Sequence, residues 1–193
     1  MYNYPLSFAC GVLAMGFATA SYFQKNKTNY LICQLLNITS LVLSYFFLEE
    51  FVALVSFAVS FLRAGMFFAY EKKDKEVSLW LKLFFVGLAI ASYVLVNVII
   101  LQKAGWLDIL CVLANILYTF SFGIRNLRVM RYVVLAPNLL SVVYNSLLPA
   151  TLFVIISFGF ELSANAVSIL QNDLLPTYKK HKKSQKEYIH END

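Results

Sequence analysis

The chain has 193 residues, of which 60% are hydrophobic and only 14% are charged, and its mean hydropathy is +0.66. A soluble domain of this size cannot bury so large an apolar fraction, so lipid must form part of its surroundings. The net charge of +5 does not indicate a nucleic-acid partner, because the Lys and Arg residues form short clusters between apolar runs.

Seven apolar segments are each long enough to cross about 30 Å of hydrocarbon as a helix. Backbone groups in lipid must be paired within the segment, so the sequence predicts an all-α integral membrane protein with seven transmembrane helices. The first segment is not a cleaved signal peptide, because no Lys or Arg precedes it and Lys25 and Lys27 follow it. In chain order the predicted spans are about 4–23, 29–48, 51–70, 79–101, 105–124, 131–150 and 156–176.

The basic residues are distributed unequally between the two sides of the membrane. With seven spans and the N-terminus outside, 13 of the 16 Lys and Arg residues fall on the cytoplasmic side, and only Lys103 falls outside. Arg63 and Lys82 lie within spans. Cytoplasmic loops carry an excess of basic residues, so the N-terminus is predicted outside and the C-terminus in the cytoplasm.

An internal repeat is the second feature of the sequence, and repeats are common in transporters. Residues 10–48 align without a gap with residues 111–149 at an offset of 101, which pairs Asn37 with Asn138. A single helix between two three-helix units lets both units face the same way across the membrane. The sequence therefore predicts a 3+1+3 arrangement, with the two units related by an axis along the membrane normal.

The third helix of each predicted unit aligns at a different offset. AVSFLR (58–63) matches AVSILQ (166–171) at an offset of 108, so Arg63 has the neutral Gln171 as its counterpart. The predicted organisation is a first three-helix bundle (1–70), a cytoplasmic loop and linker helix (71–104), a second three-helix bundle (105–176) and a basic cytoplasmic tail (177–193).

Several short motifs carry a resemblance to a known family. They are GVLAMGFATASYF (11–23), SFLR (60–63), LYTFSFGIRNLRVMRYVV (117–134), SVVYN (141–145) and ANAVSIL (164–170). In this order they resemble the YgjV-type bacterial inner-membrane protein family, which is similar in fold to SWEET/PQ-loop and PnuC-type transporters. The resemblance implies a protein of the bacterial plasma (inner) membrane.

The chain also departs from the SWEET pattern. SWEET proteins resemble one another in paired asparagines on the third helices, whereas the counterpart of Asn165 at the offset of 108 is Phe57. A symmetric sugar site is therefore not predicted.

Polar side chains within the spans are the candidate substrate site, because burying them in hydrocarbon is costly. Asn37 and Ser40 lie on one face of a helix, and Asn138 and Ser141 repeat this arrangement. We expect the four to converge near the midplane between the two units. The alternative is that they form hydrogen bonds that only hold the bundle together. The other candidates, on the third helices, are Ser60, Arg63, Asn165, Ser168 and Gln171.

Three residues have two interpretations each. Arg63 either binds an anionic group of the substrate or has a structural partner in the bundle or among lipid headgroups. Pro137 is either a hinge or a static kink. Glu161 is a candidate for proton coupling; the repeat alignment places it beside Ala53 near the outer surface, whereas counting from Pro149 places it mid-membrane, and we follow the alignment.

No catalytic site, metal site or cofactor is predicted, because His181 and His190 both lie in the tail and no phosphate-binding loop is present. We therefore predict a non-enzymatic protein, a small-solute transporter or facilitator working by alternating access between the two bundles. A non-transporting receptor or scaffold of the same fold is the alternative. The expected partners are membrane lipids, an unidentified small polar solute and, as an open option, further copies of the chain in a homo-oligomer.

Overall fold

The computed structural model describes residues 4–47, 51–100, 108–147, 152–176 and 178, and the regular structure within these ranges is entirely helical. The α-helices are α1 (Tyr4–Tyr22), α2 (Lys27–Phe47), α3 (Phe51–Lys72), α4 (Leu79–Tyr93), α5 (Asp108–Phe122), α6 (Leu127–Leu147) and α7 (Leu152–Ile169). Two π-helical segments, Val94–Ile100 and Leu170–Leu174, extend α4 and α7. The prediction of an all-α chain is confirmed, and each predicted span overlaps one helix.

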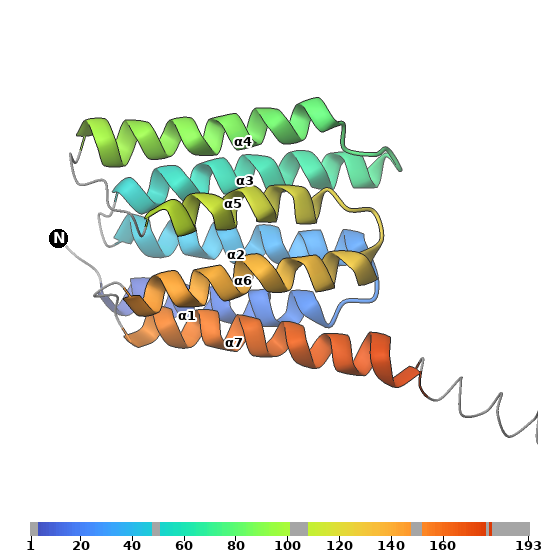
Figure 1. Ribbon diagram of the computed structural model, residues 1–193. Coiled ribbons are helices and arrows are strands. Elements are labelled where there is room, and N and C mark those ends of the chain that lie inside the picture. Colours follow the sequence, from blue (N-terminus) through green and yellow to red (C-terminus); the bar gives the residue numbers. More distant parts are fainter. Residues whose placement is uncertain (1–3, 48–50, 101–107, 148–151, 177, 179–193) are drawn as a thin grey trace, which may run out of the picture.

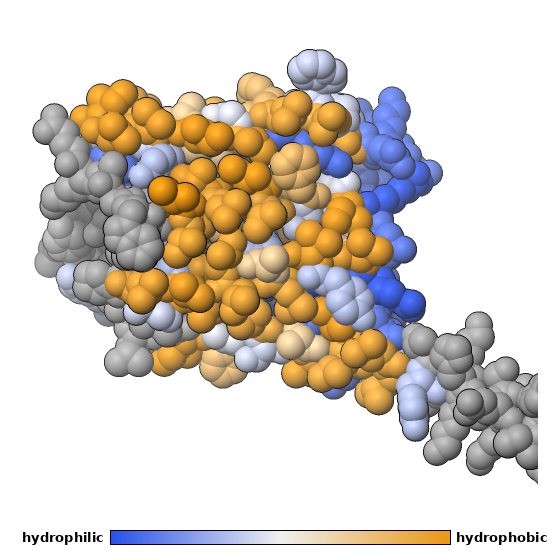
Figure 2. Space-filling view, in the orientation of Figure 1, coloured by the Kyte–Doolittle hydropathy of each residue, from blue (hydrophilic) through white to orange (hydrophobic). Residues whose placement is uncertain are grey.

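The surface of the bundle is largely apolar. Within the described residues, the stretches long and apolar enough to cross a membrane are Tyr4–Tyr22, Lys27–Phe47, Leu54–Lys72, Leu79–Ile99 and Leu127–Tyr144. Figure 2 shows apolar side chains over the visible side of the bundle, with hydrophilic residues gathered at one end. Large apolar side chains such as Trp80 and Phe84 are exposed, as lipid contact requires. The count of seven spans stays a prediction, because the apolar helix Val112–Phe122 in α5 is shorter.

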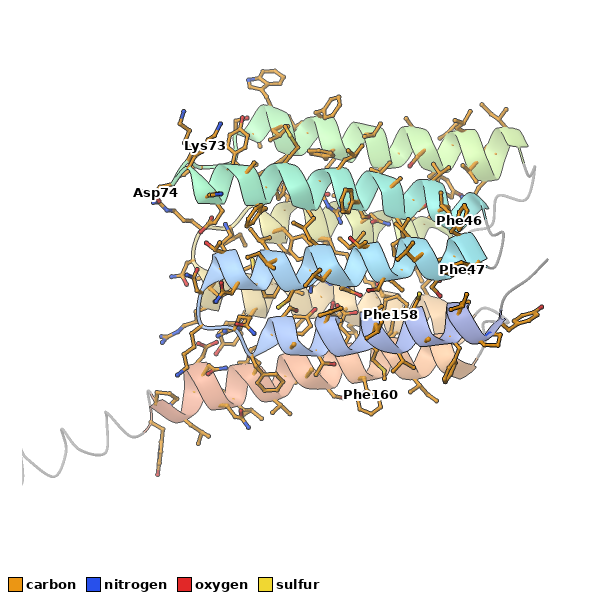
Figure 3. All side chains as sticks on the ribbon, turned by 180° about the vertical axis from the view of Figure 1, so that it is seen from behind. Phe46, Phe47, Lys73, Asp74, Phe158 and Phe160 are labelled. Carbon is orange, nitrogen blue, oxygen red and sulfur yellow. The ribbon has the colours of Figure 1, made fainter. Side chains whose placement is uncertain are left out.

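The helices lie side by side and alternate in direction (Figure 1). We call the end that carries loops 23–26, 73–78 and 123–126 the basic end; α1, α3, α5 and α7 run toward it. Figure 3 shows Lys73 and Asp74 at this end and Phe46 and Phe47 at the opposite end. The first helices of the two three-helix sets, α1–α3 and α5–α7, therefore run in the same direction.

Packing follows the same order in both sets. Helix α2 packs against both α1 and α3, and α6 packs against both α5 and α7. The sets meet through α1 with α7 and through α3 with α5, while α4 packs on α3 and α5.

Asparagine caps determine where the second helix of each set begins. The Asn26 Oδ1 atom accepts a hydrogen bond from the backbone N–H of Thr28, and the Asn126 Oδ1 atom accepts one from Arg128, each at 2.9 Å. Such caps satisfy backbone N–H groups that have no partner within the helix. Ser78 caps the start of α4 in the same way.

These caps do not fit the predicted repeat register, and the repeat itself stays a prediction. Helices α2 and α6 recur at an offset of 100, and the burial pattern of residues 31–40 is repeated residue by residue over 131–140. Asn37 therefore occupies the position of Pro137, one residue away from the predicted pairing with Asn138. The capped turn fixes the start of each helix, so it sets the register more firmly than a match between polar residues.

The third helices also differ from the predicted register. Arg63, Ala64 and Phe67 are buried on α3, and the buried residues 164, 165 and 168 on α7 follow the same spacing. That spacing corresponds to an offset of 101, not 108. By burial, the counterpart of Arg63 is therefore a buried alanine and not Gln171, which is exposed.

The buried core lies in the half of the bundle near the basic end and is rich in aromatic residues. The Tyr30 ring packs edge-on against Phe122 with centroids 5.9 Å apart, and Phe67 packs against Phe85 at the same separation. Its buried members are Tyr22, Tyr30, Leu31, Phe67, Val77, Phe85, Phe122, Met130, Val134 and Ala164. Apart from Val77 in loop 73–78, these residues come from all seven described α-helices, so this core packs the helices together near the basic end.

Candidate functional site

Polar side chains from four helices meet inside the bundle. Asn138 of α6 is 1% exposed; its Oδ1 accepts a hydrogen bond from the Tyr118 hydroxyl of α5 at 2.5 Å. Its Nδ2 donates to the Tyr22 hydroxyl of α1 at 3.0 Å, and that hydroxyl donates to the Glu161 carboxylate of α7 at 2.8 Å. We call Tyr22, Tyr118, Asn138 and Glu161 the central cluster. It joins a helix of the first three-helix set to all three helices of the second.

Polar residues of α2 continue the central cluster. The Tyr30 ring packs edge-on against the Tyr22 ring with centroids 5.8 Å apart. Gln34 Nε2 donates to the Tyr30 hydroxyl at 3.5 Å and to Ser21 Oγ at 2.9 Å, while Gln34 Oε1 accepts from Asn37 Nδ2 at 3.5 Å. Asn37 is thus connected to the central cluster through two intervening side chains of its own helix.

The two predicted serines of these helices differ. Ser141 is buried and interacts with the Tyr118 side chain, so it lies beside the central cluster. Ser40 is only half-buried, and its Oγ donates to the Leu36 carbonyl of its own helix at 2.9 Å. This bond lies within α2, so it places Ser40 neither in the central cluster nor in a hydrogen bond between helices.

Arg63 lies on α3 and faces α5. Its side chain is 5% exposed, and its Nη1 donates to the Asn115 carbonyl at 3.0 Å and to Thr119 Oγ1 at 2.8 Å. The guanidinium also lies over the Phe122 ring, 5.7 Å from its centroid. Arg63 is therefore a buried cation held by neutral groups, and the lipid-headgroup interpretation is wrong because the side chain does not reach the surface.

Two of the predicted site residues on α7 form hydrogen bonds to the backbone of neighbouring helices. Asn165 is fully buried and donates to the Arg131 carbonyl of α6 at 3.2 Å; Ser168 donates to the Tyr22 carbonyl at the end of α1. The remaining candidates of the third helices, Ser60 and Gln171, are half-buried and exposed, respectively. The structure does not bring Gln171 to the central cluster.

Glu161 lies near the middle of α7, at the level of Asn138, because both bond to the same Tyr22 hydroxyl. Its predicted place near the outer surface is wrong, and counting from Pro149 gives the better depth. The offset of 101 on the third helices makes Ser60 its counterpart, two helical turns away from the predicted Ala53. Proton coupling by Glu161 stays a prediction. So does the hinge role of Pro137, which is buried within a continuous α6.

Besides the contact between Arg131 and Asp173 described below, three ion pairs lie at the basic end: one within each three-helix set and one between loops. Two are at ordinary distances, 2.8 Å for Lys27 Nζ to Glu71 and 3.2 Å for Arg128 Nε to Asp173. The third links loops 73–78 and 123–126, and the three pairs are Lys27–Glu71, Asp74–Arg125 and Arg128–Asp173.

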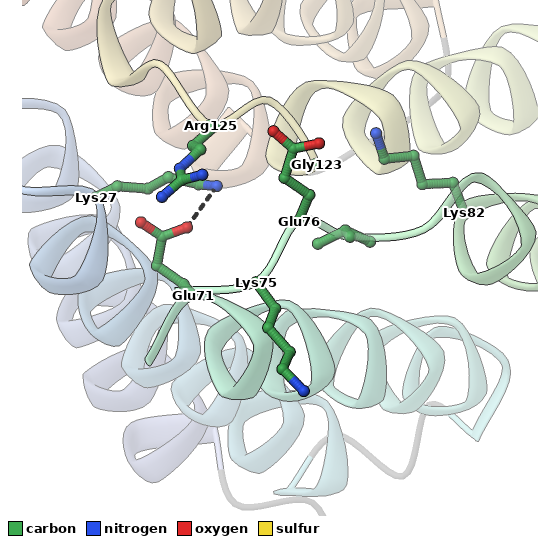
Figure 4. A pocket seen from close by; sticks show the side chains of 8 residues that line it. Lys27, Glu71, Lys75, Glu76, Lys82, Gly123 and Arg125 are labelled. Carbon is green, nitrogen blue, oxygen red and sulfur yellow. Dashed lines mark hydrogen bonds and ion pairs between the residues drawn. The ribbon is translucent and has the colours of Figure 1, made fainter. Parts of the chain in front are cut away.

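A cavity of 120 Å³ lies between these loops (Figure 4). The Lys82 side chain points toward Gly123 in this view, while Lys75 points away. The lining residues are Lys27, Glu71, Lys75, Glu76, Val77, Lys82, Gly123 and Arg125. Charges of both signs line this cavity, so it forms part of the closed basic end and not a selective anion site.

Arg131 connects this end to the first set. Its side chain is 3% exposed, its Nη2 donates to the Gln24 carbonyl in the α1–α2 loop, and its Nη1 lies 3.5 Å from Asp173. In the sequence, Arg131 is recognisable only as one of the basic residues that predict the cytoplasmic side. We call Gln24, Arg131 and Asp173 the latch.

Tyr22, Tyr118, Tyr30 and Gln34 were also missed by sequence reasoning, which treated tyrosines as part of apolar runs. A helical spacing was available as a signal on α2, because Tyr30, Gln34 and Asn37 follow one face. Within the described residues, no group of three or more His, Cys, Asp or Glu side chains is placed to hold a metal ion.

Residues 6–172 match the family model Imp-YgjV, which is described as a bacterial inner membrane protein. The match runs from α1 to the π-helical end of α7. No curated protein and no solved structure matches the chain.

Proposed function

This chain belongs to the Imp-YgjV family of bacterial inner membrane proteins, and from that premise we propose that it is a transporter or facilitator of a small polar solute. The observation that carries the proposal is the central cluster. An amide, a carboxylate and two tyrosine hydroxyls bond one another inside the bundle, where the two three-helix sets meet. Asn138 and Tyr22 are buried, and Tyr118 and Glu161 are half-buried. Ionisable and amide groups inside a membrane bundle are costly, and they commonly mark the path of a solute.

The proposed moving parts are the sets α1–α3 and α5–α7, related as a parallel repeat about the membrane normal, with α4 as the linker. Equal direction, the same packing order and the recurrence of α2 and α6 at an offset of 100 support this arrangement. Alternating access would then be a rocking of one set against the other around the central cluster.

The basic end is the proposed cytoplasmic gate, because an excess of basic residues marks the cytoplasmic side. The latch, the three ion pairs and the aromatic core all hold this end together. Opening toward the cytoplasm would separate α1 from α7 at the basic end. The C-terminus then lies in the cytoplasm and the N-terminus outside.

Uptake into proteoliposomes tests the proposal. The purified chain should take up at least one member of a panel of radiolabelled amino acids, nucleosides, vitamins and sugars above the level of empty liposomes. Absence of uptake across the panel would contradict transport and favour the receptor or scaffold alternative.

The variant Asn138→Leu should lower uptake at least about tenfold, because it removes the amide that bonds two helices at the centre of the site. The control Ser40→Ala removes only a bond to its own helix and should transport normally. Membrane insertion and thermal unfolding of both variants should be checked. Normal transport by a well-folded Asn138→Leu would assign the cluster to packing alone.

A further inference from the structure

Two residues of opposite charge lie inside the bundle, one in each three-helix set; Arg63 is buried and Glu161 is half-buried. Arg63 belongs to α3, and Glu161 belongs to α7. Arg63 has only neutral partners, namely a backbone carbonyl, a hydroxyl and an aromatic ring. Glu161 accepts a hydrogen bond from a tyrosine hydroxyl. Neither of the two residues takes part in an ion pair with another described residue.

Burial of an ionised group without a partner of opposite charge is costly, and proteins normally pair such groups. The chain does pair its other buried charges, because Lys27 bonds Glu71 and Arg131 bonds Asp173. One nitrogen of Arg63, Nε, is also buried and has no hydrogen-bond partner among the described residues. Arg63 therefore has bonding capacity that the bundle itself does not use, and Glu161 has no partner of opposite charge among the described residues.

The two charges are connected through the residues between them. Arg63 bonds Thr119, the residue next to Tyr118 on α5. The Tyr118 hydroxyl bonds Asn138, Asn138 bonds Tyr22, and Tyr22 bonds Glu161. A short chain of contacts through α5, α6 and α1 thus connects the cation of α3 to the carboxylate of α7.

We propose that the solute is zwitterionic, with a carboxylate that bonds Arg63 and an ammonium group that bonds Glu161, as a free amino acid would. This inference rests on the proposed transport function and names the substrate class of the same site. A guanidinium offers a planar pair of donors that matches a carboxylate, and a carboxylate with tyrosine rings beside it suits an ammonium group. A neutral sugar or nucleoside would leave both charges uncompensated.

Tyr22 occupies part of this site in the state that the structure describes. Its hydroxyl donates to Glu161 and accepts from Asn138, so the ammonium group of the solute would replace the hydroxyl at the carboxylate. Tyr22 is the last residue of α1, directly before the α1–α2 loop. Movement of this loop when the basic end opens would withdraw the tyrosine and make room for the solute.

The test uses the full-length protein in liposomes of phosphatidylethanolamine and phosphatidylglycerol. Uptake of a radiolabelled mixture of L-amino acids is measured in competition with three unlabelled mixtures: the same amino acids, their methyl esters and their N-acetyl derivatives. The esters lack the anion and the N-acetyl derivatives lack the cation. Each should compete at least about tenfold more weakly than the free amino acids, because each loses a charge-assisted hydrogen bond.

Charge-removing variants assign each half of the solute. Arg63→Gln should lose the preference for amino acids over their esters, and Glu161→Gln should lose the preference over N-acetyl derivatives. Arg125→Gln and Glu76→Gln, which remove charges at the basic end, should keep both preferences. Size-exclusion profiles and thermal unfolding identify any variant that fails to fold. A misfolded variant is replaced by Arg63→Lys or Glu161→Asp, which keep the charge and should keep a reduced preference.

The double variant Arg63→Gln/Glu161→Gln separates binding from internal compensation. If the two charges only compensate each other, this variant should regain the uptake lost in the single variants, and that result would overturn the proposal.

Uptake of sugars or nucleosides but not amino acids would overturn it as well, with transport itself intact. A pH-gradient dependence that Glu161→Gln alone abolishes, with the preference over N-acetyl derivatives unchanged, would assign Glu161 to proton coupling and overturn the ammonium half. If no solute of the wider panel enters, the transport proposal falls and this inference falls with it.

Discussion

Individual hydroxyl groups carry much of the polar bonding inside this bundle. Tyr118 and Tyr22 each present an apolar ring to the aromatic core and a hydroxyl to Asn138. A tyrosine can therefore lie in an apolar span and still supply a polar group at depth. Counting Tyr as apolar in a sequence hides this capacity.

Tyr118→Phe should lower the free energy of unfolding by about 1–2 kcal/mol, because the ring stays while the buried Asn138 carbonyl loses the shorter of its two hydrogen bonds and keeps only that from Tyr22 at 3.4 Å. Thermal or denaturant unfolding in detergent measures the change. Tyr132→Phe is the matched control, since Tyr132 is exposed on the same bundle and its hydroxyl should contribute little. Equal effects of the two changes would show that the bond to Asn138 contributes nothing.

Two ion pairs of this chain differ in how far they are buried. Asp173 is 5% exposed and pairs with Arg131, which is also buried, whereas Asp74 is 87% exposed in its pair with Arg125. Asp173→Asn should destabilise the chain by about 3 kcal/mol, because it leaves a buried guanidinium without its charge partner. Asp74→Asn should cost less than about 1 kcal/mol, since solvent screens an exposed pair. Thermal unfolding of the two variants side by side provides the measurement.

The helices themselves follow from the sequence more directly than their register does. Hydropathy located each helix, because backbone groups in lipid leave few alternatives. The register was missed by one residue, because the alignment was anchored on matching polar residues such as Asn37 and Asn138. The motif Ser-aromatic-x-x-basic-Asn, at 21–26 and 121–126, was available and gives the offset of 100. It is the better anchor, since its asparagine caps the next helix.

Asn26→Ala and Asn126→Ala should each destabilise the chain by about 1 kcal/mol, because each removes the cap of one helix. The two losses should add in the double variant, since the caps lie on different loops. Unfolding in detergent gives all three values. Asn172→Ala on the π-helical end of α7 tests whether loss of an amide outside a cap has the same effect.

The central cluster could be predicted from the sequence only in part. Asn138 and Glu161 can be predicted because polar groups in spans are rare. Their tyrosine partners cannot, because the bond from Tyr22 to Glu161 joins residues far apart in the chain and depends on how α1 packs on α7. No periodicity within a helix contains that information.

At the scale of the whole molecule, the proposed topology puts the basic end in the cytoplasm. In a variant lacking its native cysteines, Lys25→Cys and Lys73→Cys should react with a membrane-impermeant maleimide in inverted vesicles and not in intact cells. Both positions are exposed at the basic end, so access to the reagent depends on sidedness alone. The basic tail should behave in the same way, although residues 179–193 lie outside the described part of the chain. Labelling from outside in intact cells would refute the orientation.

The end of α1 has one further consequence. Within three residues, this part of the chain supplies the Tyr22 hydroxyl to the central cluster, the Tyr22 carbonyl to Ser168 and the Gln24 carbonyl to Arg131. If solute displaces Tyr22, as proposed, it also works against the bonds of the latch, and the two equilibria are thermodynamically linked. As long as the open state is the minor one, a change in the latch that favours opening by a given factor would raise the apparent affinity for solute by nearly the same factor. Arginine and carbonyl groups that never touch the solute would then contribute to its affinity.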